Sequence, residues 1–131
     1  MSTSANPAGA RTILYVEDNE ANRMIVRDLL KRTKYNLVEA HDGEAGVAKA
    51  LETRPDLILM DIQLPKISGL EAIRRLRAEA ATAATPIVAI TSFALSGDEQ
   101  NAKEAGATGY LAKPYSPFDL LNLIRKLLPE G

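Results

Sequence analysis

The sequence lacks cysteine and tryptophan altogether, and it holds a single histidine, two phenylalanines and four tyrosines. Without cysteine, disulfide frameworks, thiolate zinc clusters and cysteine nucleophiles are excluded. So few aromatic rings provide little material for stacking nucleic-acid bases. The longest aliphatic runs, such as residues 57–60, fall far short of the roughly 18 residues that a membrane-spanning helix requires. We therefore expect a domain that binds neither nucleic acid nor membrane.

Neither sign of charge dominates the chain, because sixteen basic and seventeen acidic residues give a net charge of -1. This balance also argues against the basic stripe of a nucleic-acid binder. The 131 residues amount to about one domain, long enough to bury a single core. Residues 1–10 are small and polar and lack the features of a signal peptide. We expect a disordered tail there, followed by one soluble, cytoplasmic domain over residues 11–129.

Short apolar runs alternate with longer amphipathic stretches along the chain. The runs cover residues 13–16, 36–38, 57–60, 86–90 and 110–112. Three of them are continuous rather than alternating, which is typical of parallel strands buried on both faces. A strand–helix order repeated five times predicts an α/β fold with one five-stranded, doubly wound parallel sheet.

The helices are indicated by apolar spacing and by capping signals. Apolar residues at helical spacing mark the first and last helices: Met24, Ile25, Leu29 and Leu30, then Leu120, Leu121, Ile124, Leu127 and Leu128. Ser68, Ser96 and Ser116 each begin a capping-box pattern and are the expected N-caps of three helices. Gly106 suits a helix C-cap.

Polar residues follow four of the predicted strands: Glu17, Asp18, Asp61, Thr91 and Lys113. Each has a simple structural explanation by itself, since an aspartate after a strand is often a helix N-cap. In an open α/β sheet, however, ligands bind outside the carboxyl ends of the strands. We therefore expect these side chains to meet at one site.

The chemistry of such a cluster is restrictive. Three neighbouring carboxylates repel one another, and one is driven to protonate unless a cation neutralises them. Oxygen ligands without histidine or cysteine select Mg2+, Mn2+ or Ca2+, and Mg2+ leaves coordination positions open for phosphate oxygens. Lys113 would add a second positive charge and Thr91 a hydroxyl donor, as phosphoryl transfer requires. No glycine-rich nucleotide-binding loop occurs, so we expect neither ATP nor a dinucleotide to bind.

Four motifs together resemble the signature of bacterial response-regulator receiver domains, the CheY-like family. They are VEDN at 16–19, LMDIQLP at 59–65 with Gly69, IT at 90–91, and KP at 113–114. The resemblance extends over residues 12–128, and the wording of the motifs is most similar to DivK-type single-domain response regulators. It implies a flavodoxin-like sheet with strand order 2-1-3-4-5.

The resemblance also implies a role for each matching acidic residue. Asp61 corresponds to the phosphoacceptor. Asp18 and Asp61 would bind Mg2+ directly, with Mn2+ as a possible substitute, and Glu17 would act through a metal-bound water. The backbone carbonyl of Gln63 would be a further ligand.

The remaining matching residues imply a switch. Thr91 and Lys113 would contact the phosphoryl oxygens. Tyr110 corresponds to the aromatic residue whose ring responds to Thr91, and Lys113-Pro114 to a cis peptide bond.

Two positions in the family influence the water that hydrolyses the acyl phosphate, and here they hold Gln63 and Phe93. Phenylalanine offers no acceptor to orient this water, and its ring can shield the phosphoryl group. We therefore expect the phosphorylated state to decay slowly.

The resulting prediction is a phosphorylation-switched binding module of two-component signal transduction, and not an enzyme. Its phosphoryl donor would be the phosphohistidine of a sensor histidine kinase or histidine phosphotransferase, because the chain's own His41 is expected in a solvated loop. Its output would be a protein contact made by the fourth helix, fifth strand and fifth helix of a monomer or weak dimer.

Two alternatives remain open at this point. A Mg2+-dependent phosphohydrolase of the haloacid-dehalogenase type could use Asp61 as its nucleophile. Such enzymes need a second aspartate two residues later, where this chain has Gln63. The chain could also be a receiver module excised from a longer transcription factor or hybrid kinase, although it shows neither a helix-turn-helix nor a trailing linker.

Overall fold

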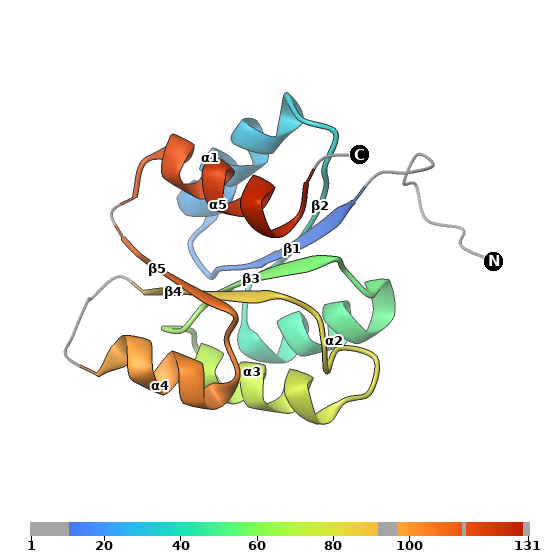
Figure 1. The fold of residues 1–131 in the computed structure, drawn as a ribbon, viewed down its shortest axis with the longest axis vertical. Coiled ribbons are helices and arrows are strands. Elements are labelled where there is room, and N and C mark those ends of the chain that lie inside the picture. The colour runs from blue at the N-terminus through green and yellow to red at the C-terminus, as the bar shows by residue number, and fades with distance from the viewer. Residues whose placement is uncertain (1–10, 92–96, 114, 130–131) are drawn as a thin grey trace.

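The computed structural model describes residues 11–91, 97–113 and 115–129. Within these residues strands and helices alternate, as the sequence predicts (Figure 1). The strands are β1 (Thr12–Val16), β2 (Asn36–Ala40), β3 (Leu57–Asp61), β4 (Ile87–Thr91) and β5 (Gly109–Ala112). The helices are α1 (Glu20–Lys31), α2 (Gly43–Thr53), α3 (Gly69–Ala78), α4 (Asp98–Ala105) and α5 (Pro117–Leu127). None of these helices is long and apolar enough to cross a membrane.

The strands form one parallel sheet in the order β2-β1-β3-β4-β5, which confirms the predicted topology. Helices α1 and α5 cover one face, and α2, α3 and α4 cover the other (Figure 1). From β1 the chain first builds outward to β2 and then returns to the other side with β3. This reversal of strand order places the ends of β1 and β3 at the position where doubly wound folds bind their ligands.

The core has one apolar layer on each face of the sheet. Leu14 and Val16 of β1 point toward α2 and α3, while Ile13 and Tyr15 point toward α1 and α5. All residues of β1, β3 and β4 are buried, as the continuous apolar runs predict. The edge strand β2 is only partly buried, which accounts for its weaker sequence pattern.

The predicted N-caps are confirmed at α3 and α5, whereas α4 has a different N-cap from the predicted one. The hydroxyls of Ser68 and Ser116 accept backbone N–H bonds from the first turns of α3 and α5. Gly106 ends α4 in the left-handed conformation, with φ of 115°. Helix α4, however, has Gly97 as its N-cap without a side-chain cap. The predicted cap Ser96 lies outside the described residues.

The apolar stripe predicted for α1 is wrong in part. Val26 and Leu30 are the buried residues of this helix. Met24 and Ile25 are 49% and 55% exposed. Each residue turns the helix by about 100°, so positions one and two before Val26 point away from the face shared by Val26 and Leu30. Ile25 instead borders a groove between α1 and α5.

One arginine joins two loops at the amino ends of the strands. The guanidinium of Arg77, in α3, donates to the carbonyl of Gly106 at 2.8 Å, beyond the end of α4. It also donates to the carbonyls of Thr85 at 2.7 Å and Thr82 at 3.0 Å, in the loop before β4. Arg77 thereby fixes the chain entering β4 and β5.

Candidate functional site

The polar residues predicted to meet do gather at the carboxyl ends of the strands. Glu17 and Asp18 follow β1, Asp61 ends β3, and Lys113 follows β5. One carboxylate oxygen from each of the three acidic residues lies within 4.8 Å of the other two. Glu17 and Asp61 are buried, whereas Asp18 is exposed and forms the outer side of the cluster. Residues far apart in the sequence thus form one acidic site.

The ammonium group of Lys113 bridges the two buried carboxylates. Its Nζ atom lies 2.6 Å from Oε1 of Glu17 and 3.1 Å from Oδ2 of Asp61. Burial lowers the pKa of Lys113, but the hydrogen bonds to Glu17 and Asp61 outweigh this and hold it above its ordinary value. The lysine therefore stays charged and keeps a cation against the cluster.

The two bridged carboxyl groups differ in acidity. Burial raises the pKa of Asp61 to about 6, and the negative charge of Glu17 raises it further. The backbone N–H of Gln63 and the ammonium of Lys113 lower this pKa but do not outweigh the burial. Burial also acts on Glu17, but its hydrogen bonds from Lys113 and Asp61 hold its pKa below the ordinary value. Of these two carboxyl groups, Asp61 is therefore the one that is protonated first. This agrees with the expectation that neighbouring carboxylates drive one of their number to protonate.

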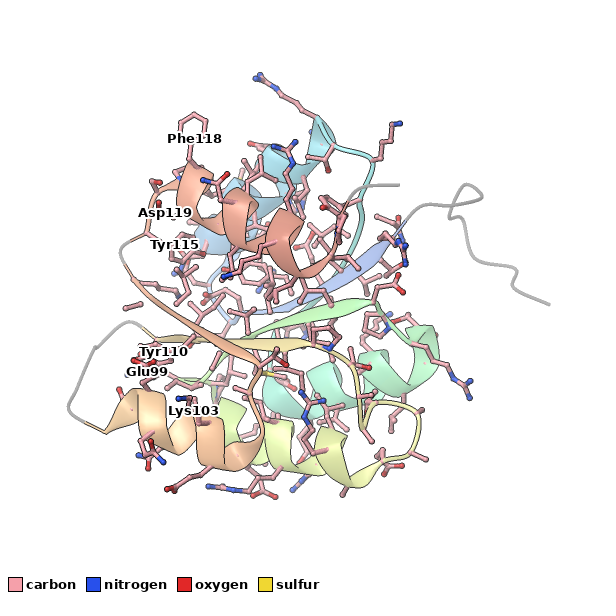
Figure 2. The ribbon with its side chains drawn as sticks, viewed as in Figure 1. Glu99, Lys103, Tyr110, Tyr115, Phe118 and Asp119 are labelled. Atoms are coloured by element: carbon pink, nitrogen blue, oxygen red, sulfur yellow. The ribbon has the colours of Figure 1, made fainter. Side chains whose placement is uncertain are left out.

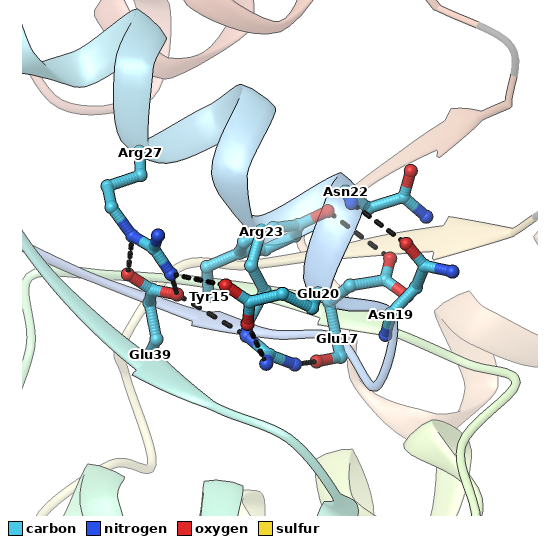
Figure 3. Close-up of polar contacts among 8 residues, drawn as sticks. All are labelled: Tyr15, Glu17, Asn19, Glu20, Asn22, Arg23, Arg27 and Glu39. Atoms are coloured by element: carbon cyan, nitrogen blue, oxygen red, sulfur yellow. Dashed lines mark hydrogen bonds and ion pairs between the residues drawn. The ribbon is translucent and has the colours of Figure 1, made fainter.

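Local contacts fix Glu17 in place (Figure 3). Its Oε2 accepts from the backbone N–H of Asn19 at 3.2 Å, and its Oε1 accepts from the hydroxyl of Tyr15 at 3.2 Å. A guanidinium nitrogen of Arg23 donates to its backbone carbonyl at 2.6 Å. The sequence interpretation missed Tyr15 and Arg23. Tyr15 could have been found, since residues two apart point to the same side of a strand.

The loop after β3 depends on a glycine. A Cβ atom on Gly69 would come within 2.1 Å of the carbonyl oxygen of Asp61 and 2.5 Å of the Cα of Ile62. Only glycine therefore lets α3 begin so close to the end of β3. In the same loop the backbone N–H of Gln63 donates to Oδ1 of Asp61 at 2.8 Å, which orients that carboxyl group.

The two residues predicted to form a switch lie on neighbouring strands. Thr91 ends β4, is fully buried and pairs with Ala112, while Tyr110 of β5 pairs with Ala89. Because alternate residues share a face, Thr91 and Tyr110 face the same side of the sheet. Tyr110 packs beside Glu99 and Lys103 of α4 (Figure 2). Together they line a cavity of about 90 Å³.

Several predicted positions fall elsewhere. The side chain of His41 is 72% exposed, in agreement with a solvated position. Phe93 and Pro114 lie outside the described residues, so the predictions of water shielding and of a cis peptide bond stay predictions. The same holds for the tail over residues 1–10. The role of the Gln63 carbonyl as a ligand also stays a prediction.

Comparison with known proteins assigns this fold and site to a class. Residues 13–125 match the family model of the response regulator receiver domain. This match covers most of the chain, and the chain belongs to that family. It is a receiver domain of two-component signal transduction, which favours the signalling interpretation over the phosphohydrolase.

Among proteins of known function, this chain is similar to single-domain response regulators of the DivK type. The polar-differentiation response regulator DivK of Brucella anthropi is 38% identical over 121 residues, which cover 92% of this chain and 98% of the relative. DivK of Brucella abortus is 37% identical over the same coverage. The resemblance to DivK-type regulators is thereby confirmed.

Solved structures agree with this assignment. The receiver domain of a sensor histidine kinase from Pseudomonas aeruginosa superposes with a TM-score of 0.83 at 36% identity, covering 90% of this chain and 97% of that one. That structure holds a magnesium ion in its active-site cleft. CheY4 of Vibrio cholerae has a TM-score of 0.85 at 32% identity, covering 91% of this chain and 99% of its own.

Proposed function

We propose that Asp61 accepts a phosphoryl group from the phosphohistidine of a sensor histidine kinase or histidine phosphotransferase, in a Mg2+-dependent step. The observation that carries this proposal is the meeting of three carboxylates and one ammonium group at one edge of the sheet. Asp61 is buried in this arrangement, 3.1 Å from the Nζ of Lys113. No other buried aspartate among the described residues has both an ammonium within 3.1 Å and two neighbouring acidic groups.

The residues of the cluster fit a magnesium ion. They offer only oxygen ligands, which Mg2+ and Mn2+ prefer. Asp18 and Asp61 would bind the ion directly together with the carbonyl of Gln63, and Glu17 would hold one of its waters. When bound, the ion neutralises the carboxylates and the charge on the phosphoryl oxygens.

The chain's own residues then supply the rest of the chemistry. A carboxylate oxygen of Asp61 forms a bond to phosphorus while the bond from phosphorus to the partner's imidazole nitrogen breaks, and that nitrogen keeps the electron pair. Lys113 stabilises the negative charge on the transferred oxygens, and Thr91 donates its hydroxyl to one of them. The buried position of Asp61 limits the access of competing water.

We further propose that the domain, over residues 11–129, is a binding module that promotes only its own phosphorylation and dephosphorylation. Gln63 supports this, since a phosphohydrolase of the haloacid-dehalogenase type would need an aspartate at that position as the general acid for its leaving group. The output would pass through the face of α4, β5 and α5 of a monomer or weak dimer. The packing of Tyr110 against α4 supports this face, because a ring in contact with a surface helix can transmit a change at Thr91.

The test is to label the protein with a small phosphodonor or a phosphorylated kinase. The parent protein should gain one acid-labile, hydroxylamine-sensitive phosphoryl group in Mg2+ and none in EDTA. Asp61→Asn should abolish the label. Asp56→Asn is the matched control, because Asp56 precedes the opposite end of β3 and accepts a hydrogen bond from the backbone N–H of Thr12. Labelling of the Asp61→Asn protein at the same site would refute the assignment.

A further inference from the structure

Tyr15 is the largest fully buried side chain of the described core, and it carries a polar atom into the sheet. Its hydroxyl lies 3.2 Å from Oε1 of Glu17. A buried hydroxyl is costly unless it is hydrogen-bonded, and this one ends on a carboxylate of the acidic cluster. The contact therefore connects the apolar layer under α1 and α5 to the site.

A second tyrosine extends this connection. The phenol groups of Tyr115 and Tyr15 are neighbours, and that of Tyr115 helps to raise the pKa of the Tyr15 hydroxyl. Each hydroxyl has one proton, and an ionised carboxylate can only accept. The proton of Tyr15 therefore points to Glu17, and the oxygen of Tyr15 can accept the proton of the Tyr115 hydroxyl. Tyr115 itself borders the groove of about 430 Å³ between α1 and α5.

This inference rests on the function proposed above, in which Lys113 contacts the phosphoryl group. The hydroxyl of Tyr15 matters because Lys113 then holds Glu17 less firmly. Lys113 lies 2.6 Å from the Oε1 atom of Glu17 that Tyr15 also contacts. Once the ammonium contacts a phosphoryl group, its hold on Glu17 weakens. Of the donors described here, the Tyr15 hydroxyl then remains on Oε1 and the N–H of Asn19 on Oε2. Both donors are neutral, so neither repels a magnesium ion.

We propose that Tyr15 is a positioning residue for the magnesium site, holding the Glu17 carboxylate in its ligand-binding orientation, and that Tyr115 orients the Tyr15 hydroxyl. Glu17 has a longer side chain than aspartate, with one more rotatable bond to restrain. The tyrosine hydroxyl supplies this restraint from inside the core, where the ring is fully buried. Partners of this kind behind metal ligands commonly change metal affinity by about 10- to 100-fold.

The experiment measures the Mg2+ dissociation constant by calorimetry for the whole protein and three tyrosine variants. Tyr15→Phe should weaken Mg2+ binding about tenfold. Tyr115→Phe should weaken it by about two- to threefold, since it acts through Tyr15. Tyr35→Phe is the matched control. Tyr35 is also buried, but its hydroxyl donates to the carbonyl of Leu128, away from the site, and its loss should leave the constant unchanged.

A second background separates positioning from packing. In Lys113→Met protein, Tyr15 is the remaining described side-chain donor to Oε1 of Glu17, so Tyr15→Phe should weaken Mg2+ binding by a larger factor than it does in the parent. A tyrosine that only fills space would give the same factor in both backgrounds. Circular dichroism melts check that each variant is folded, and if Tyr15→Phe is not, Tyr115→Phe in the two backgrounds decides the question.

The outcomes distinguish this inference from the function on which it rests. If the parent protein binds no Mg2+ and takes no label, the proposed function fails. If the parent binds Mg2+ and the Tyr15→Phe protein binds it with the same dissociation constant, only the positioning role is overturned. The same holds for the Tyr115→Phe protein where Tyr15→Phe does not fold.

Discussion

Lys113 and Asp61 form an ion pair at 3.1 Å although Lys113 follows β5 and Asp61 ends β3, two strands that are not neighbours in the sheet. Strand β4 lies between them, and the lysine side chain crosses its end to reach the carboxylate. The pair therefore links the carboxyl ends of β3 and β5 across β4, where the acidic cluster lies. The ammonium group of Lys113 is also placed where it can contact a phosphoryl group bound to Asp61.

The raised pKa of Asp61 predicts that this carboxylate destabilises the metal-free protein at neutral pH. A carboxyl group whose pKa rises from 3.8 to about 6 on folding contributes stability below about pH 4 and loses it as the pH rises through 6. In EDTA at pH 7.5, Asp61→Asn should raise the free energy of unfolding by about 1 to 3 kcal/mol. Urea unfolding at pH 7.5 and pH 4 measures this, and the gain should vanish at the lower pH. The exposed Asp28→Asn serves as control, and an equal effect in both variants would contradict the prediction.

Magnesium affinity should depend on the same titration. Below pH 6 the ion must displace a proton from Asp61, so its apparent affinity should fall by up to about tenfold per pH unit. Above pH 7 the affinity should level off. Calorimetry in two buffers with different ionisation enthalpies reports both the affinity and the proton released. An affinity that stays constant from pH 5 to pH 8 would show that Asp61 is ionised throughout.

The lifetime of the phosphorylated state tests the prediction made from Phe93. If its ring shields the acyl phosphate, Phe93→Glu should speed the loss of label, because a carboxylate can orient the attacking water. Phe93→Leu, which keeps an apolar side chain, should stay close to the parent. Decay of labelled protein after removal of the donor gives the rate. A Phe93→Glu protein that decays no faster than the parent would exclude shielding.

Tyr110 should couple phosphorylation to partner binding. The parent protein should bind a partner of the α4–β5–α5 face more tightly in the presence of beryllofluoride, by about 5- to 150-fold if the coupling is typical of allosteric proteins. In Tyr110→Ala this difference should shrink, since the ring that packs on α4 is gone. The control is Met24→Ala, an exposed apolar residue of α1 that lies outside this face. Equal affinities in all titrations would indicate a different output surface.

Arg77 should contribute strongly to stability. Removing its guanidinium leaves several loop carbonyls without their donor, and we expect Arg77→Met to lower the free energy of unfolding by about 2 to 3 kcal/mol. Arg77→Lys should recover only part of this, since one ammonium group cannot reproduce the planar fork. Arg74→Met, on the exposed side of the same helix, should change stability by less than about 0.5 kcal/mol. Denaturant unfolding compares the three variants.

The sequence predicted the sheet well because strands buried on both faces leave continuous apolar runs, as at residues 57–60. It predicted the acidic cluster because parallel strands end at one edge. It could not predict which side of α1 faces the sheet, since Met24, Ile25, Val26 and Leu30 are all apolar. The contacts of Arg23 and Tyr115 were also out of reach, because they depend on how helices and loops cross in space.

The contacts of Arg77 hold the loop after α4, at Gly106, against α3. The first turn of this eight-residue helix lies on the side of the sheet where the strands end and the acidic cluster lies (Figure 1). The helix is about 12 Å long, and a tilt of about 10° around its anchored end moves the first turn by about 2 Å. A tilt about the end held by Arg77 would therefore displace the first turn of α4 most, and this is the turn in which Glu99 lies beside Tyr110 (Figure 2).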